Sequence, residues 1–253
     1  LFRKAFSVDK PLASARAYVS GLGYFRMTLN GEPVSDHVLD PVVTHYDRRT
    51  KYLVFDIADQ LRPGENAIGV TLGNGWYNQH TESAWDFDKA PWRNNPRLIA
   101  QIELRYTDGS RSIVSSGKDW RWAAGPITFD GIRNGVHYDA GRELPGWDEP
   151  GFDESDWQPV ALVDAPTQNL SPQLMPPARV IERLPVADSW KLSDTLTVFD
   201  FGENTSGRAV VRVSGPPGAS LILRYGERIH PDGSLDQKEI ARFIRTGVPQ
   251  TDR

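Results

Sequence analysis

Alternation between apolar and polar side chains is the feature of this sequence that most constrains its fold. It is clearest in RLIAQIELRYTDGSRSIVSSG, whose first half carries an apolar residue at every second position: Leu98, Ala100, Ile102, Leu104 and Tyr106. Because neighbouring side chains of a strand point to opposite faces, these residues share one face, which must be buried. Asp108-Gly109 follows as a tight turn, so the stretch predicts a β-hairpin.

Short strands between turn residues are predicted along the rest of the chain. Twenty-two glycines and 19 prolines, against two methionines, favour strands and turns over helices. The first half predicts four strands, at Ala15–Ser20, Tyr24–Leu29, Tyr52–Ile57 and Asn66–Leu72. The last third predicts three more, at Leu196–Phe201, Gly207–Val213 and Ser220–Glu227. Between Asp119 and Trp157 the signals weaken, and we expect long loops capped by aromatic side chains.

A proline-rich, polar segment from Asp164 to Val180 separates two sets of strand signals. We place a domain boundary near Pro176-Pro177 and expect an extended linker, with the alternative that the segment lies across the first sandwich. The predicted fold class is all-β, with two β-sandwich, jelly-roll-like domains in tandem at residues 1–175 and 176–253. The second domain shows no closing strand, and we expect it to be truncated at its C-terminal end.

Charge and composition exclude several classes of function. The formal net charge of -4 comes from interspersed acidic and basic residues, so no basic stripe marks a nucleic-acid partner. No apolar run approaches the roughly 18 residues that span a bilayer, so no membrane partner is predicted. Without cysteine the chain has no disulfide, thiolate metal site or cysteine nucleophile, and its five histidines are too scattered for a zinc site.

Four segments, in a fixed order, resemble one known family. They are LNGEPVSDHVLDPVVTHYDRRTKYLVFDI, then GNGWY with the downstream APWRNNP, then GVHYDAGRELPGWDEPGFDESDW, and finally FDFGENTSGRAVVRVSGPPGASLILRYGE. The series resembles the region that precedes the catalytic domain in bacterial α-L-rhamnosidases of glycoside hydrolase family 78. The resemblance covers nearly the whole chain and implies a rhamnosidase N-terminal domain followed by a concanavalin-like rhamnosidase domain.

The resemblance also implies that catalysis and accessory functions belong to different domains of the protein. Its members hydrolyse terminal α-L-rhamnose in glycans or glycosides with inversion, using two glutamates of an (α/α)6 barrel that follows such a region. This chain would then hold no catalytic residue and be inactive alone, and its partners would be a rhamnose-containing glycan and the downstream barrel. Two alternatives stay open, a free-standing rhamnose-binding lectin-like module and a purely structural spacer between domains. Periplasm and cytoplasm of a bacterium both stay open as its compartment.

The run GNGWYNQHTESAWDFDKAPWRNNP has a composition typical of a carbohydrate site. It holds three tryptophans, a tyrosine and four asparagines, with neither helical nor strand periodicity. Aromatic rings stack on the C–H faces of sugars, and amides and carboxylates pair with their hydroxyls. The resemblance implies that some members bind rhamnose with calcium through loops matching GNGWY and IRNGVHYDA. It maps onto six candidate carbohydrate-binding residues: Asn74, Trp76, Tyr77, Asn134, Tyr138 and Asp139.

The alternative is that the rings of this run close the open end of a sandwich. Aromatics under long loops commonly form a satellite core, an interpretation that applies to Trp85 and that we favour for Trp76 and Trp92. The metal is undetermined and no other cofactor is predicted. Asn74 is neutral where metal-binding members tend to carry an acid, and Ca²⁺ prefers carboxylate oxygens. The nearby acids that could supply them are Asp86, Asp88 and Asp139.

Overall fold

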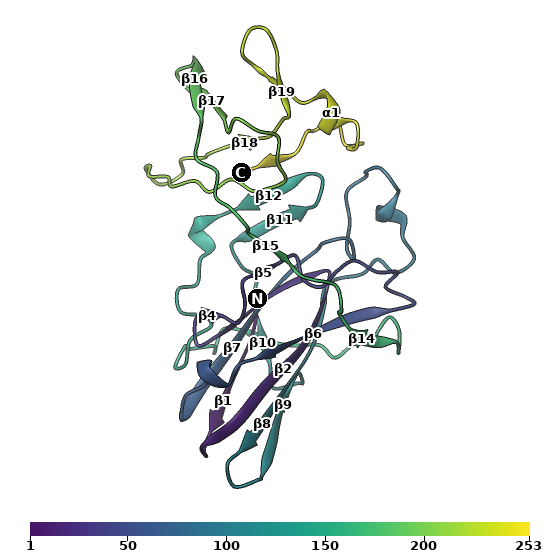
Figure 1. Cartoon of the computed structure of the whole chain (residues 1–253), viewed down its shortest axis with the longest axis vertical. Coiled ribbons are helices and arrows are strands. Elements are labelled where there is room, and N and C mark those ends of the chain that lie inside the picture. Colours follow the sequence, from purple (N-terminus) through teal and green to yellow (C-terminus); the bar gives the residue numbers. More distant parts are fainter.

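The computed structural model describes all residues from 1 to 253, and two large β-sheets form its main body (Figure 1). The six-stranded sheet has the order β13 (Gln158–Pro159), β10 (Arg121–Trp122), β1 (Phe2–Val8), β7 (Gly64–Gly73), β3 (Tyr24–Leu29) and β4 (Glu32–Pro33). The five-stranded sheet has the order β14 (Leu170–Pro172), β6 (Thr50–Asp56), β2 (Leu12–Leu22), β8 (Arg97–Tyr106) and β9 (Arg111–Ser115). One core of buried residues draws on both sheets, so they pack face to face as a β-sandwich.

The predicted hairpin is confirmed as β8 and β9. Ala100, Ile102 and Leu104 are buried in the core, and Gly109 takes a φ of 82° at the turn. The predicted strands are also present: 24–29 coincides with β3, and 15–20, 52–57 and 66–72 correspond to β2, β6 and β7. At the centre of the five-stranded sheet, β2 pairs antiparallel with both β6 and β8. A short 3-10 helix, η1 (Ala58–Gln60), follows β6.

A buried arginine fixes the loops between residues 144 and 157. Arg3 is 2% exposed, and its guanidinium donates to the backbone oxygens of Trp147, at 2.8 Å, and Glu149, at 3.0 Å. It also forms an ion pair with Glu154, so the buried charge has partners. The Trp147 and Trp157 rings stack with centroids 5.9 Å apart. These contacts match the expected aromatic-capped loops over residues 144–157, whereas residues 127–138 of the same predicted stretch form a strand pair instead.

The segment expected to be an extended linker lies on the first sandwich instead. β14 pairs in parallel with β6, and β15 (Ala178–Arg179) pairs antiparallel with β5 (His37–Val38). Lys51 Nζ donates to Ser171 Oγ at 3.0 Å, and Arg179 Nε donates to Asp36 at 2.8 Å. The expectation of an extended linker is therefore wrong, and the alternative, in which the segment lies across the first sandwich, is the one observed. The physical reason is that the exposed edge of β6 offers unpaired backbone groups, which the passing segment satisfies.

The C-terminal segment consists of small two-stranded sheets. Its pairs are β16 (Asp188–Ser193) with β17 (Leu196–Asp200), β18 (Leu223–Arg224) with β21 (Thr251–Asp252), and β19 (Arg228–Ile229) with β20 (Leu235–Asp236). The predicted strand 196–201 is confirmed by β17, whereas 220–227 contains only two strand residues before β19. The predicted strand 207–213 is wrong: Val210 is 80% exposed, and no strand pairs with it. An isolated strand leaves its backbone groups without partners, so the apolar pattern alone cannot stabilise it.

A hairpin joins this segment to the sandwich. It is built from β11 (Ile127–Gly131) and β12 (Gly135–Tyr138), and Figure 1 places it between the sandwich and the C-terminal strands. The single α-helix, α1 (Lys238–Ala241), is short, and no helix has the length and apolar character required to cross a membrane. The all-β class is confirmed by this architecture.

Candidate functional site

The loop after β7 and the loop after β11 meet around one carboxylate. Asp130, near the end of β11, accepts hydrogen bonds from the backbone N–H of Asn74 at 2.7 Å and from its side-chain amide at 2.5 Å. The amide oxygen of Asn74 in turn accepts from the amide of Asn78 at 2.6 Å. The amide nitrogen of Asn74 therefore bonds the second loop, and its amide oxygen is engaged within the first loop. Asp130 was not among the predicted residues, although an acid two residues before IRNG was the available signal.

A second link is made through Asn134. Its amide oxygen accepts from the Thr81 hydroxyl at 2.5 Å, and its amide nitrogen lies 3.3 Å from the hydroxyl of Thr246. Gln79 supports Thr81 by donating to its backbone oxygen at 2.9 Å. Asn134 thus connects the first loop, the second loop and the C-terminal segment. The predicted residues Asn74 and Asn134 therefore each bond the first loop to the second, through separate sets of hydrogen bonds.

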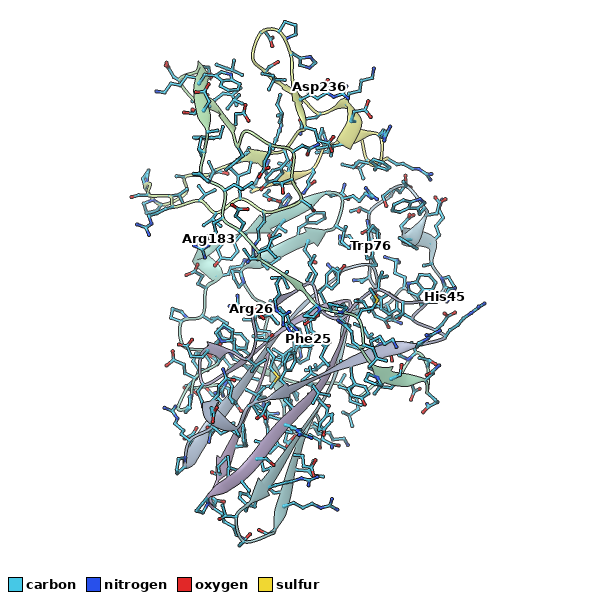
Figure 2. The ribbon with its side chains drawn as sticks, viewed as in Figure 1. Phe25, Arg26, His45, Trp76, Arg183 and Asp236 are labelled. Carbon is cyan, nitrogen blue, oxygen red and sulfur yellow. The ribbon has the colours of Figure 1, made fainter.

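Tyr77 belongs to a small buried cluster and offers no ring for a sugar to stack on. Tyr77 and Tyr46 are each 1% exposed, with ring centroids 5.2 Å apart, and Leu22 completes the cluster. Burial raises the pKa of both tyrosines above the ordinary value. Trp76 and Trp92 are partly buried and pack against this cluster, as the satellite-core interpretation predicts. In Figure 2, Trp76 lies at the level where the sandwich meets the C-terminal segment.

Trp85 behaves differently from the other two tryptophans. Its ring is 62% exposed, so the satellite-core expectation is wrong for this residue. Trp85 and Asp86 both have positive φ values, 74° and 52°, which cost energy in residues other than glycine. The Arg133 guanidinium lies 4.6 Å from the Trp85 ring centre and 4.6 Å from that of Phe243. Phe243 belongs to the C-terminal segment, so this stack ties the second loop to that segment. Desolvation lowers the pKa of Arg133.

The side chains of Tyr138 and Asp139 make no hydrogen bond to Asn74 or Asn134. The Tyr138 hydroxyl donates to Glu143, and this hydrogen bond to a carboxylate raises the pKa of Tyr138 to about 12. Asp139 caps the short helix η3 (Ala140–Arg142) by accepting from the backbone of Gly141 at 3.0 Å, and it also accepts from Arg142 Nε at 3.1 Å. Both side chains therefore have local structural partners.

Most of the oxygen atoms that could hold a cation are engaged by protein donors, whereas Asp88 Oδ1 is buried without a hydrogen-bond partner. Asp86 accepts from Arg245 at 2.6 Å, and that positive charge holds the pKa of Asp86 below its ordinary value. The side-chain oxygens of Asn74, Asn134 and Asp130 all accept hydrogen bonds from neighbouring side chains or backbone. Nowhere in the chain do three or more His, Cys, Asp or Glu side chains gather as a metal-binding group. The contacts of Asn74, Asn134 and Asp130 form a hydrogen-bonded junction between the two loops.

The C-terminal strand completes this junction. The Tyr138 N–H donates to the Arg253 oxygen at 2.7 Å, the Arg253 N–H to the Val136 oxygen at 2.8 Å, and the Thr251 N–H to the Asn134 oxygen at 3.0 Å. The Asp252 carboxylate accepts from the Val136 N–H at 2.8 Å and from the Tyr225 hydroxyl at 2.6 Å. These bonds hold β21 and the residue after it beside β12, so backbone hydrogen bonds join the two parts of the chain.

Comparison with known families gives two adjoining matches. Residues 10–182 match the family described as "Alpha-L-rhamnosidase N-terminal domain", and residues 190–248 match "Bacterial alpha-L-rhamnosidase concanavalin-like domain". An alpha-L-rhamnosidase of Formosa agariphila is 36% identical over 98% of this chain and 28% of its own length. One from Streptomyces avermitilis is 36% identical over 89% of this chain and 22% of its own length.

Solved structures give the same result. The structure of Streptomyces avermitilis alpha-L-rhamnosidase complexed with L-rhamnose aligns with a TM-score of 0.89 and 31% identity, covering 99% of this chain and 24% of that one. The structure of alpha-L-rhamnosidase from Dictyoglumus thermophilum aligns with a TM-score of 0.84 and 33% identity, covering 99% and 27%. The chain thus spans about a quarter of the length of the relatives that it matches.

Proposed function

Because the chain belongs to the α-L-rhamnosidase family, with that family's N-terminal domain at residues 10–182, we propose that it is the accessory β-sandwich region of an enzyme that hydrolyses terminal α-L-rhamnose from glycans or glycosides. The reaction is an inverting hydrolysis, in which one carboxylic acid protonates the leaving oxygen and one carboxylate activates a water. Both groups belong to a helical barrel elsewhere in the longer protein. This chain supports that barrel and is inactive by itself.

The observation that carries the proposal is the difference in coverage between this chain and its relatives. The Formosa relative aligns with 98% of this chain but with only 28% of its own length. Nearly three quarters of that enzyme therefore lies outside the shared region, ample for a separate catalytic domain. The match spans the sandwich and the C-terminal segment together, so both belong to the accessory region.

The junction gives a supporting role its physical basis. Backbone hydrogen bonds of residues 251–253 with residues 134–138, the amide of Asn134 and the Arg133 stack all tie the C-terminal segment to the sandwich. Several independent contacts resist rotation between two bodies better than a single one. A catalytic domain in contact with the C-terminal segment is thereby held in a defined orientation relative to the sandwich.

The test of this function is a dissection of the longer protein. Proton NMR of an aryl α-L-rhamnoside during hydrolysis identifies the anomer that forms first. The longer protein is expected to release the β-anomer first, the signature of inversion, and a version that lacks residues 1–253 is expected to be less stable to heat. Initial release of the α-anomer would contradict the inverting mechanism, and unchanged heat stability would contradict the supporting role.

Rhamnose binding by the loops is a second candidate, which the exposed ring of Trp85 favours. A strained backbone holds this ring outward, next to the loop that carries Asn134. A sugar would stack on Trp85 rather than on Tyr77, and it would displace Thr81 or Thr246 to bond the Asn134 amide. L-rhamnose should then shift the tryptophan fluorescence, and Trp85→Ala should abolish the shift. The exposed Trp122 of β10 is the matched control, because Trp122→Ala should leave the response intact.

A further inference from the structure

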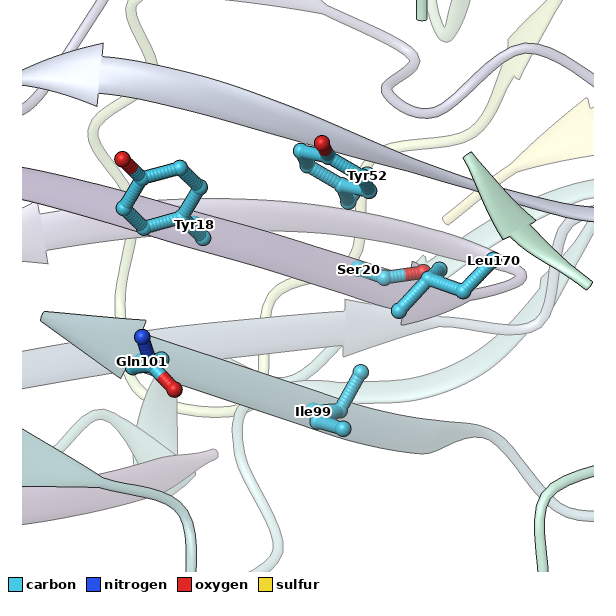
Figure 3. A pocket seen from close by; sticks show the side chains of 6 residues that line it. All are labelled: Tyr18, Ser20, Tyr52, Ile99, Gln101 and Leu170. Carbon is cyan, nitrogen blue, oxygen red and sulfur yellow. The ribbon is translucent and has the colours of Figure 1, made fainter. Parts of the chain in front are cut away.

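The outer face of the five-stranded sheet carries a hollow of about 220 Å³, separate from the two loops (Figure 3). Its lining consists of six neutral side chains: Tyr18, Ser20, Tyr52, Ile99, Gln101 and Leu170. On β2, Ala17 and Val19 are buried in the core, so the residues that alternate with them face outward. Leu170 belongs to β14, so one wall exists only because that segment pairs with β6.

The hollow combines apolar surfaces with unengaged polar groups. The ring centroids of Tyr18 and Tyr52 lie 6.2 Å apart, and the ring planes are tilted by 54°. Figure 3 shows the two rings side by side along the sheet. Gln101 lies directly opposite Tyr18 in the pairing of β2 with β8, and Ile99, 55% exposed, lies opposite Ser20. Ser20 is fixed by donating to the Lys51 backbone oxygen at 2.7 Å. The two phenol hydroxyls and the Gln101 amide are left to bond a ligand or water.

We infer that this hollow binds one neutral sugar ring of a glycan. A sugar ring has an apolar C–H face and a rim of hydroxyls, and the hollow offers aromatic and aliphatic surface for the first and phenol and amide groups for the second. None of the six lining residues is charged, which disfavours phosphates and acidic sugars. Its volume lies below the roughly 300–1,000 Å³ of pockets for drug-sized ligands, so a single ring fits.

The surroundings set the limits of this surface. An adjoining hollow of about 100 Å³ is lined by Ser14, Arg16, Glu103 and Arg105, so the neutral surface ends two residues along β2 from Tyr18. Five of the lining residues stand on β2, β6 and β8, and Leu170 stands on β14, which pairs with β6. All six are therefore held in place by strand pairing before a ligand arrives. The inference does not depend on the catalytic identity of the longer protein, because the hollow lies entirely within the sandwich.

The test is a titration of the 253-residue chain with L-rhamnose, D-glucose and D-galactose, followed by amide chemical shifts in two-dimensional NMR. At least one sugar is expected to bind with a dissociation constant on the order of 1 mM, with the shifts concentrated on β2, β6 and β8. Tyr18→Ala and Tyr52→Ala are expected to weaken binding by about tenfold or more. Because both changes also remove partly buried rings, Gln101→Ala is the third variant, with an exposed side chain whose loss leaves the sheet intact.

Two controls make the result decisive. Ile113, 52% exposed on the same sheet face, lies outside the hollow, and Ile113→Ala should not change the affinity. Binding that Trp85→Ala abolishes and Tyr18→Ala leaves unchanged belongs to the loops and overturns the inference. Absence of binding by all three sugars also overturns it. The same titration of the longer protein must reproduce the shifts, since their loss there would show that another domain covers the face.

Discussion

Replacing Gly135 with alanine should release the C-terminal strand while leaving the sandwich folded. Gly135 has a φ of 97°, and a Cβ there would lie 2.2 Å from the Thr251 backbone oxygen. No shift of a flexible side chain relieves that contact, because the clashing atom belongs to the backbone. The strand must therefore move away from the hairpin or the hairpin must deform.

The magnitude follows from the bonds that would break. Four hydrogen bonds join the strand backbone and the Asp252 carboxylate to residues 134–138, at 2.7 to 3.0 Å. At about 0.5–1.5 kcal/mol net for each, the junction contributes about 2–6 kcal/mol. That range corresponds to an increase of roughly 30-fold or more in the fraction of molecules with the strand detached.

Gly109→Ala is the matched control. Gly109 has a φ of 82°, so alanine there suffers a comparable left-handed strain of about 1–2 kcal/mol, but nothing lies within 4 Å of its Cβ position. Limited proteolysis should cleave Gly135→Ala faster within residues 183–253 and leave its sandwich intact, whereas Gly109→Ala should be cleaved there at the original rate. Equal rates for the two variants would refute the argument that the clash with Thr251 controls the junction.

Three further predictions follow from the same contacts. In chemical denaturation, Trp120→Ala should lower the free energy of unfolding by about 3–5 kcal/mol, because its ring is buried in the core. Trp85→Ala should change it by about 0.5 kcal/mol or less, because that ring is exposed. Equal losses would contradict the assigned burial. Arg245→Ala should raise the pKa of Asp86, as measured by NMR of the carboxylate. Because this pKa is lowered in the folded chain, the ion pair stabilises the fold at neutral pH. That stabilisation is lost as the pH falls through the folded-state pKa. A calcium chelator should leave the melting temperature unchanged, because Asp86 and Asp139 already pair with arginines; a fall that calcium reverses would contradict this.

The sandwich could be predicted from sequence because its strands alternate strongly and end at recognisable turns. The hairpin of β8 and β9 needs only local information, since its buried face and its Asp108-Gly109 turn are adjacent in the chain. The pairing of β14 with β6 could not be predicted, because three residues without periodicity dock on an edge far away in sequence. Residues 207–213 have the alternating apolar pattern of a strand, but no other strand of the chain pairs with them, so no strand forms there.

The candidate site was predictable in location but not in orientation. Composition singled out the run from Gly73 to Pro96, yet the ring that faces solvent is Trp85 and the ring that is buried is Tyr77. Which ring turns outward depends on positive φ values and on packing against Tyr46, a residue outside the run. Asp130 was missed because a single acid near a strand end has many roles, and only its contacts with Asn74 reveal this one.

The most direct test of the proposed function is the initial rate at which the purified 253-residue chain releases the chromophore from an aryl α-L-rhamnoside. The rate should stay at that of the buffer at every protein concentration, because both catalytic carboxyls are proposed to lie in the barrel. The longer protein, assayed in parallel, should release it readily. A rate that rises in proportion to the concentration of the chain and survives repurification would contradict the assignment of this region as accessory.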